Sequence, residues 1–409
     1  MAFQIITPQQ FHNHILAADA QAFEQSPQMA LLLKKRGYRI QMVGYVKDND
    51  IKVSALVFST PIAGGLAMEI NNGPIVTDPT YLEDFYKGLQ NFSKQEGAIE
   101  LKVKPYDNYQ ILDSNGSALS EENQALIDHM QHLGFQHSGL EVGYHTGDWN
   151  YVKDLSQLTP ETLFKSFSKK GRPLVKKAKT FGIKIKKLER SDLAIFKEIT
   201  SATSDRRDFD DKPLEYYEYL FDSFGDKAEF VIATLNFQDY LDNLNTDQAK
   251  LKEKIDRLAN DLEKNPNSEK KQNQYRELSS QFETFDVRKK EAQELINQYG
   301  QNDTPLCASL FLYLEKEAFY LYSGSYSEFN RFYAPAILQE YAMLEAMKRG
   351  LKRYNFLGIK GVFDGTDSIL RFKQNFEGYI EHKPGYFLYH PHPLKHKTYQ
   401  FIKKLLGRN

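Results

Sequence analysis

The strongest charge feature of the sequence is a basic segment that spans residues 165–187. It contains ten lysine or arginine residues and no aspartate or glutamate. Such a segment favours binding of a polyanion, for example RNA or an anionic lipid head group, because its cations replace the counterions of the phosphates. The alternative is a solvated basic helix face without a partner. If RNA is the partner, the residues expected to contact it are Lys169, Lys170, Arg172, Lys176, Lys177 and Lys179.

A second charged cluster, residues 205–212, directly precedes a predicted helix that carries Tyr216. Side chains four residues apart lie on one face of a helix. Lys212 and Tyr216 have this spacing, and an ammonium beside a phenol can bind a diphosphate. The simpler interpretation is an ion-paired start of a helix.

Lys373 follows an aromatic residue, Phe372, in a segment with Gly358 and Gly361 upstream. A lysine in this setting can stabilise the oxyanion that develops when an ester is attacked. Taken alone, such a lysine is more often a surface residue. No serine or cysteine has the sequence context of an activated nucleophile. In a transferase, direct attack by the amine of the substrate is therefore the more natural chemistry.

Common cofactor and metal motifs are missing from the sequence. It has no Walker loop, no G-x-G-x-x-G and no H-E-x-x-H. A His-Pro-His-Pro run at residues 390–393, with His396 close by, suggests a metal site but has no acidic or cysteine neighbours in the sequence. We therefore expect neither a metal nor a cofactor. The single cysteine, Cys307, excludes a disulfide within the chain.

Length and composition limit the architectures that can hold these residues. The chain has 409 residues, of which 41% are hydrophobic, and this length predicts two domains. The formal net charge is −1, so RNA binding would need a local patch. We find neither a secretion signal nor an apolar stretch long enough to span a bilayer. These features are typical of a cytoplasmic protein.

Strand and helix signals alternate along most of the chain, which predicts an α/β (α+β) fold. Residues 39–46 and 51–59 have the pattern of strands, and residues 81–95 have helical apolar spacing. The same alternation returns further along the chain. We expect a first domain over residues 1–150 and a second over residues 151–395.

Residues 241–300 interrupt the second domain and differ from it in composition. Residues 246–299 contain no glycine and are rich in lysine, glutamate, aspartate, glutamine and asparagine. Their apolar residues recur every three or four positions, which predicts an antiparallel coiled-coil hairpin that projects into solvent. The hairpin is either a spacer or dimerisation arm, or an arm that contacts RNA, and we favour RNA contact.

Basic and apolar residues interleave in the last segment, residues 396–409. This pattern predicts a short amphipathic helix. The helix could rest on an anionic membrane or dock on the first domain, and the sequence leaves both open. Membrane contact would place the protein at the inner face of the membrane.

Several short motifs are not informative one by one, but their order along the chain is specific enough to indicate a protein family. They are Gln25-Ser26, Gly37-Tyr38, Asn72-Gly73-Pro74, the basic segment, residues 209–217, the charged hairpin, Tyr322-Ser323-Gly324, residues 329–341, residues 353–358 and Phe372-Lys373. In this order they resemble the Fem family of aminoacyltransferases, which build the interpeptide bridges of peptidoglycan. Within the family, the phrases KGRPLVKKAKTFGIK and TSDRR are most similar to the MurM and MurN branch, and more like MurN.

The resemblance implies a fold and a reaction. The fold is two acetyltransferase-like (GNAT) domains with the coiled-coil arm inserted in the second. The reaction moves an amino acid from aminoacyl-tRNA to an amine on the stem peptide, or its first bridge residue, of a lipid II or UDP-MurNAc-pentapeptide type of precursor. Alanine is the amino acid that the resemblance favours, with serine second. Family members work without a metal or an acyl-enzyme.

The resemblance also implies roles for individual residues. Lys212, Tyr216 and Tyr322 occupy positions that bind the acceptor, and Phe372 and Lys373 occupy those that handle the aminoacyl ester.

Two positions depart from the family pattern. The lysine that family members place in the cleft is Leu33 here, and we expect the adjacent Lys34 to replace it. A carboxylate at the end of a strand is Lys104 here, which favours proton transfer assisted by the substrate over a carboxylate base.

Three other functions remain open from the sequence. One is an acyl-CoA-dependent N-acyltransferase, although residues 328–332, before a predicted helix, lack the glycines of a pyrophosphate loop. Another is transfer of an amino acid to a protein N-terminus, which would not explain the hairpin. The third is a non-catalytic tRNA-binding protein that uses the basic segment and the hairpin.

Overall fold

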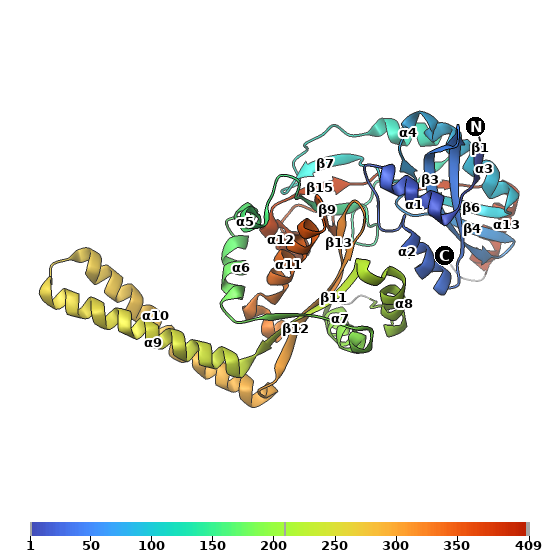
Figure 1. Cartoon of the computed structure of the whole chain (residues 1–409). Helices are drawn as coiled ribbons and strands as arrows, with labels where there is room; N and C mark the ends of the chain where they lie inside the picture. The colour runs from blue at the N-terminus through green and yellow to red at the C-terminus, as the bar shows by residue number, and fades with distance from the viewer. Residues whose placement is uncertain (1, 208–209, 406–409) are drawn as a thin grey trace.

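A computed structural model describes residues 2–207 and 210–405 of the chain. Two mixed sheets form the body of the molecule, and a helical arm extends from it (Figure 1). Residues 208 and 209 of the second charged cluster, and residues 406–409 of the last segment, lie outside the described residues. Among the described residues, no helix combines the length and the apolar character needed to cross a membrane.

The first sheet is antiparallel except for one parallel pair, β4 with β6. Its order is β1-β2-β3-β4-β6-β16-β8, and β5 pairs with β3. The strands are β1 (Ala2–Ile5), β2 (Arg39–Lys47), β3 (Asp50–Ile62), β4 (Gly65–Ile70), β5 (Ile75–Val76), β6 (Ala98–Val103), β8 (Gln136–His137) and β16 (Phe387–Tyr389). The helices of this domain are α1 (Pro8–Ala17), α2 (Pro27–Lys35), α3 (Leu82–Gln95) and α4 (Gln124–His132).

The second sheet repeats this plan, again with one parallel pair, β13 with β14. Its order is β10-β11-β12-β13-β14-β9-β15-β7. The strands are β7 (Gln110–Asp113), β9 (Trp149–Asp154), β10 (Lys184–Lys187), β11 (Ala228–Asn236), β12 (Asp303–Tyr313), β13 (Ala318–Ser325), β14 (Arg353–Gly358) and β15 (Tyr379–His382). The helices are α5 (Pro160–Leu163), α6 (Gly171–Lys179), α7 (Leu193–Arg207), α8 (Leu214–Phe224), α11 (Ala334–Lys348) and α12 (Ser368–Lys373).

The predicted fold class, two α/β domains with an inserted helical arm, is confirmed. The two sheets, however, exchange strands across the predicted boundary at residue 150. Strand β7 comes from the first part of the chain and pairs with β15 in the second sheet. Strand β16 comes from the end of the chain and pairs with β6 and β8 in the first sheet. The boundary in the sequence therefore does not coincide with the division between the sheets.

Apolar packing joins the two domains as well as filling each one. One buried cluster contains Leu32 and Met42 of the first domain together with Tyr217, Leu220 and Phe319 of the second. Helix α2 presents this face because Ser26 accepts a hydrogen bond from the Met29 amide and so caps its start. A shared core of this kind fixes the relative position of the domains, and so the shape of any site between them.

The arm consists of two long antiparallel helices, α9 (Phe237–Lys264) and α10 (Glu269–Tyr299). It begins slightly earlier than predicted, at the end of β11, and projects away from the body (Figure 1). Ile255 and Leu258 are buried in its seam, as the spacing predicted. At its base, Tyr240 packs its ring against Phe332 of the body.

Helix α13 (Pro393–Leu405) covers part of the predicted last segment, residues 396–409. It contacts β6 of the first domain, where the His396 Nε2 lies 3.8 Å from the Glu100 Oε2. Of the two alternatives for this segment, docking on the first domain is the one that the first turns of α13 adopt. Leu394 and Phe401 remain 81% and 64% exposed.

Candidate functional site

A cavity of about 640 Å³ lies between the two domains. Its walls come from the ends of the parallel pairs in both sheets, since Asn72 and Lys104 follow β4 and β6, whereas Tyr322 lies in β13 and Leu357 in β14. Concave sites between domains that carry convergent polar groups are where substrates usually bind. The cavity is therefore the candidate active site.

A buried ionic network supports one side of this cavity and links the domains. The Tyr106 hydroxyl, in the cavity wall, donates to Glu317 over 2.6 Å. Arg353 binds Glu317 and Glu381 over 2.6 Å each, and Lys383 binds Glu381 over 3.1 Å. Burial alone would raise the pKa of Glu381, but Lys383 and Arg353 lower it to about 2. Glu381 therefore stays ionised at neutral pH and can anchor Arg353 and Lys383 behind the cavity wall.

Three predicted acceptor residues gather around Tyr322, the one of them that lines the cavity. The hydroxyls of Tyr216 and Tyr322 lie 3.3 Å apart, and the Lys212 ammonium lies 5.8 Å from the centre of the Tyr216 ring. Burial raises the pKa of both tyrosines, so both hydroxyls keep their protons and can donate. The structure thus brings together the residues expected to bind an anionic group.

Lys34, the fourth predicted acceptor residue, is exposed and is not part of the cavity wall. Its neighbour Lys35 forms an ion pair with Asp222 over 3.2 Å. Arg36 instead reaches the tyrosine cluster, with its guanidinium 5.4 Å from the centre of the Tyr216 ring. Helix α2 ends at Lys35, so Arg36 leaves the helix in a different direction from Lys34. The sequence analysis missed Arg36 because the direction of a side chain at a helix end is not visible in residue spacing.

Lys373 is 3% exposed and lies behind the cavity wall. Its ammonium donates to the carbonyls of Leu357 over 2.9 Å and Gly358 over 2.6 Å, and both of these residues line the cavity. Burial lowers the pKa of Lys373 to about 7. The ring of Phe372 packs edge-on against Phe376, 5.5 Å away. Lys373 therefore borders the cavity from within the second domain, whereas Phe372 packs against the core of that domain and is not part of the cavity wall.

The backbone at this wall is strained. Leu357 has a φ of 58°, in the left-handed region that favours glycine, and the Asn355 side chain accepts a hydrogen bond from its amide over 2.8 Å. A leucine in this conformation costs free energy that the surrounding contacts must supply. Together, Asn355 and Lys373 hold the strained turn in place, and this arrangement is common where a backbone faces a substrate.

Glu24 is a cavity residue that the sequence analysis did not single out. Its Oε1 accepts from the Asn72 side chain over 2.7 Å, while its Oε2 is buried without a hydrogen-bond partner among the described residues. Burial raises the pKa of Glu24 to about 7. A usable signal was its position beside Gln25-Ser26, since Gln25 in turn contacts the Asn72-Gly73-Pro74 turn.

Other carboxylates of the cavity wall face cations. Asp148 lies 2.7 Å from the Lys104 ammonium, and Glu69 lies 3.1 Å from that of Lys102. Lys104 also donates to the Thr146 carbonyl over 2.5 Å. Lys104, which stands where family members have a carboxylate, thus neutralises Asp148, the residue directly before β9 of the second sheet. Among the wall carboxylates of the described chain, Glu24 has no ion pair, and Glu141 faces only a histidine, with its Oε2 3.4 Å from the His145 Nε2.

The predicted basic segment is divided between paired and unpaired cations. Lys179 forms an ion pair with Glu340 over 2.6 Å, Lys184 pairs with Asp239 and Asp303, and Lys187 pairs with Glu229. These partners lie far away in the sequence, so the absence of nearby acidic residues did not reveal them. The exposed cations of the predicted RNA-contacting set for which the structure describes no ion pair are Lys169, Lys170, Lys176 and Lys177; Arg172, also without a described ion pair, is half-buried.

The start of α6 is docked directly beside the Lys373 element. The Ser168 amide donates to the Asn375 carbonyl over 3.0 Å. A Cβ at Gly171 would lie only 1.8 Å from the same oxygen, so only glycine permits this approach. The exposed cations of α6 and the Lys373 side of the cavity therefore belong to one rigid unit.

Comparison with known proteins agrees with this architecture. The FemAB family matches residues 6–404. Aminoacyltransferase FemA of Staphylococcus epidermidis is 26% identical over 426 residues, which cover 99% of this chain and 100% of the relative. FemA of Staphylococcus aureus (strain bovine RF122) is 25% identical over 425 residues and covers 100% of both chains. A crystal structure of FemX superposes with a TM-score of 0.78 at 20% identity, covering 98% of this chain and 100% of that one, and so has the same fold.

The family match spans almost the whole chain, both domains and the arm included. The resemblance seen in the order of the sequence motifs is thereby confirmed. The chain belongs to the FemAB family and is an aminoacyltransferase.

Proposed function

We propose that this enzyme transfers an amino acid, alanine in the first place and serine in the second, from aminoacyl-tRNA to an amine of a peptidoglycan precursor. The acceptor amine is the stem-peptide lysine or a first bridge residue already attached to it. The observation that carries the proposal is the position of the cavity. It has a cationic, hydroxyl-rich end at Tyr216 and Tyr322, and it borders the Lys373 element on which the basic helix α6 is docked.

The tyrosine end suits the anionic group of the acceptor. A diphosphate would accept hydrogen bonds from the Tyr216 and Tyr322 hydroxyls and form ion pairs with Lys212 and Arg36. The charged groups of these two residues lie 5.8 Å and 5.4 Å from the centre of the Tyr216 ring. Both the lipid-linked and the nucleotide-linked precursor carry this group. Such binding would leave the stem peptide to run along the cavity.

The basic face suits the donor. The exposed Lys169, Lys170, Lys176 and Lys177 would bind phosphates of the tRNA acceptor arm. Because α6 packs on Asn375, two residues after Lys373, the aminoacyl ester would enter from this side. The arm of α9 and α10 starts from the same domain and offers a second surface for the tRNA.

In the proposed reaction, the acceptor amine attacks the ester carbonyl in its neutral form. The bond from nitrogen to the carbonyl carbon forms, and the carbonyl becomes an oxyanion. When the oxyanion collapses, the ester bond to the tRNA ribose breaks, and a proton from the attacking nitrogen passes to the ribose oxygen, which leaves as a hydroxyl. With a pKa of about 7, Lys373 is partly protonated at neutral pH, and its protonated form has three N–H donors. Two of them bind the carbonyls of Leu357 and Gly358, which leaves one for the oxyanion. Positioning would supply much of the acceleration, on the order of 7–11 kcal/mol for a well-oriented pair.

The proton of the acceptor ammonium must leave before attack. Glu24 can accept it, because its pKa of about 7 is close to the working pH and its Oε2 has no described partner. This assignment differs from the expectation of proton transfer assisted by the substrate alone. The family carboxylate that Lys104 replaces would then have a substitute on another wall of the cavity.

The deciding experiment is transfer of radiolabelled alanine from alanyl-tRNA to the lipid-linked and nucleotide-linked precursors. Each acceptor is tested with and without a first bridge residue. Transfer only to the extended acceptor assigns the second bridge position, and transfer to the bare lysine assigns the first. Failure with both alanyl-tRNA and seryl-tRNA would overturn the proposal and return the acyl-CoA enzyme and the non-catalytic tRNA binder as alternatives.

A further inference from the structure

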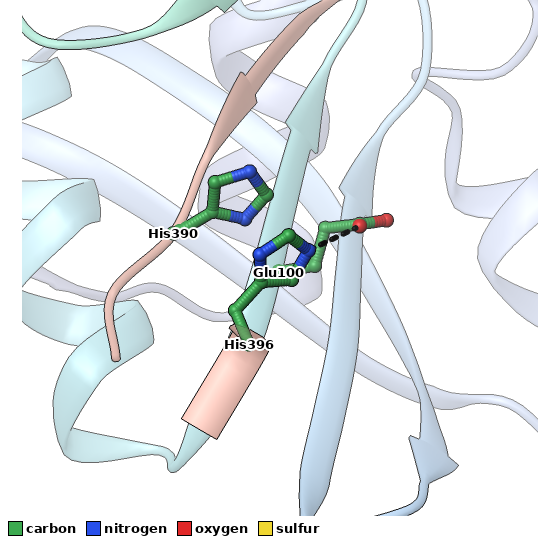
Figure 2. Close-up of side chains that lie close together, drawn as sticks. All are labelled: Glu100, His390 and His396. Atoms are coloured by element: carbon green, nitrogen blue, oxygen red, sulfur yellow. Dashed lines mark ion pairs between the residues drawn. The ribbon is translucent and has the colours of Figure 1, made fainter. Parts of the chain in front are cut away.

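Two histidines and a glutamate meet on the first domain (Figure 2), and none of the three lines the cavity. Glu100 lies in β6, His390 directly follows β16, and His396 lies in the first turns of α13. Because Tyr389 pairs with Leu101, the antiparallel register places His390 opposite Glu100. Three separate elements therefore each contribute one side chain to this cluster.

The three side chains bring potential metal ligands close together. One potential ligand atom from each residue lies within 4.8 Å of the others. The His396 Nε2 is 3.8 Å from the Glu100 Oε2, and the two imidazole rings are stacked with their centres 3.6 Å apart. The Nδ1 of His390 is buried and has no hydrogen-bond partner in the described part of the chain. A buried imidazole nitrogen without a partner is costly, and a ligand at this point would remove the cost.

We propose that Glu100, His390 and His396 bind a divalent transition metal ion of the zinc class. Two imidazoles and one carboxylate form a known zinc ligand set, with a water molecule as the fourth ligand. A hard cation such as Mg²⁺ or Ca²⁺ prefers oxygen ligands and does not match two histidines. No metal was expected because the histidine run has no acidic neighbour in the sequence, but the fold supplies Glu100 from β6, in the first part of the chain.

Metal binding requires a small rearrangement of the stacked rings. The lone pairs of an imidazole lie in the ring plane, so the two rings must turn about their Cβ–Cγ bonds until both point at one ion. All three residues are only half-buried, and the turn of His396 would replace the contact of its Nε2 with the Gln400 side chain, 3.1 Å away. The bound ion would connect β6, the end of β16 and α13, and so fasten the C-terminal helix to the first domain.

The test uses the full-length protein without a histidine tag, after treatment with a chelator and dialysis. Titration with Co²⁺ should give visible absorption bands that saturate at one ion per chain and disappear when Zn²⁺ is added. The His396→Ala and Glu100→Gln variants should bind Co²⁺ at least about tenfold more weakly, since loss of even an indirect metal contact costs this much. The matched control is His392→Ala, because His392 lies in the same run but contacts the Lys94 carbonyl instead.

A second measurement distinguishes a variant that lacks the metal site from one that binds poorly because it is misfolded. Zn²⁺ should raise the melting temperature of the wild type and of His392→Ala, and leave that of His396→Ala unchanged. Absence of Co²⁺ and Zn²⁺ binding by the wild type would overturn the proposal. Equal affinity in the wild type and His396→Ala would overturn it as well, because the ion would then bind elsewhere.

Discussion

Replacement of Lys373 by methionine should separate the catalytic role of this lysine from the cost of burying it. The pKa of Lys373 falls from an ordinary 10.5 to about 7 on folding. At about 1.4 kcal/mol for each pKa unit, burial of the charge costs about 5 kcal/mol at pH 7 or below. Methionine removes this cost but leaves the Leu357 and Gly358 carbonyls without a donor, at about 1–3 kcal/mol each. The variant should therefore stay within about 3 kcal/mol of the wild type in stability, while turnover falls about 10²–10³-fold.

The lowered pKa of Lys373 also predicts the direction in which the stability of the wild type changes with pH. Between pH 7 and 10.5, the unfolded chain holds a proton on Lys373 that the folded protein has lost, so stability rises with pH. From pH 7 to pH 9, this one group should add about 2 kcal/mol to the free energy of unfolding of the wild type relative to Lys373→Met. Urea denaturation of both proteins at the two pH values measures the difference.

The control is Lys360→Met, at an exposed lysine near the same loop, which should keep the pH dependence and turnover of the wild type. Parallel stability curves for the wild type and Lys373→Met would show that Lys373 has an ordinary pKa. Unchanged turnover in Lys373→Met would remove this residue from the mechanism altogether.

Three further predictions concern the acceptor, the proton and the donor. Arg36→Ala should raise the KM for the acceptor about tenfold with little change in that for tRNA, whereas Lys34→Ala should leave both unchanged; equal effects of the two variants in steady-state kinetics would contradict the assignment. Glu24→Gln should lower kcat/KM and flatten the acidic limb of its pH profile near pH 7, because the group that must lose its proton is gone; an intact limb would exclude Glu24 as the proton acceptor. Lys176→Gln should weaken tRNA binding and make it less dependent on salt by about one ion contact, as measured by filter binding at several salt concentrations; Lys179→Gln, which removes a cation paired with Glu340, should weaken it less, and the reverse order would contradict the division of the basic segment.

The sequence predicted what depends on local pattern. Strands β2 and β3, helix α3 and the hairpin of α9 and α10 agree with the predicted ranges to within a few residues. The order of short motifs was sufficient to indicate the family. These features depend on helical periodicity and on turn residues, and both can be recognised from residues that are close together in the sequence.

The sequence could not predict what depends on partners that are remote along the chain. Lys179 was expected to contact RNA, but Glu340 on α11 faces it. Glu24 gains its raised pKa from burial between two domains, which no window of residues reveals. Glu100 and His396 come together only because β16 returns to the first sheet.

The return of β16 also sets the order in which this protein can be completed during synthesis. Strand β8 pairs with β16 rather than directly with β6, so the edge of the first sheet has a vacancy until residues 387–389 leave the ribosome. The facing edges of β6 and β8 therefore stay unpaired while the second domain and the arm are translated. The two halves are consequently not separable modules, and a fragment that stops at residue 150 would lack one strand of its own sheet and carry one that belongs to the other. The arm lies between β11 and β12, so a change in its length leaves the exchanged strands in place. Replacement of one whole domain by another would remove a strand from the sheet of the other domain.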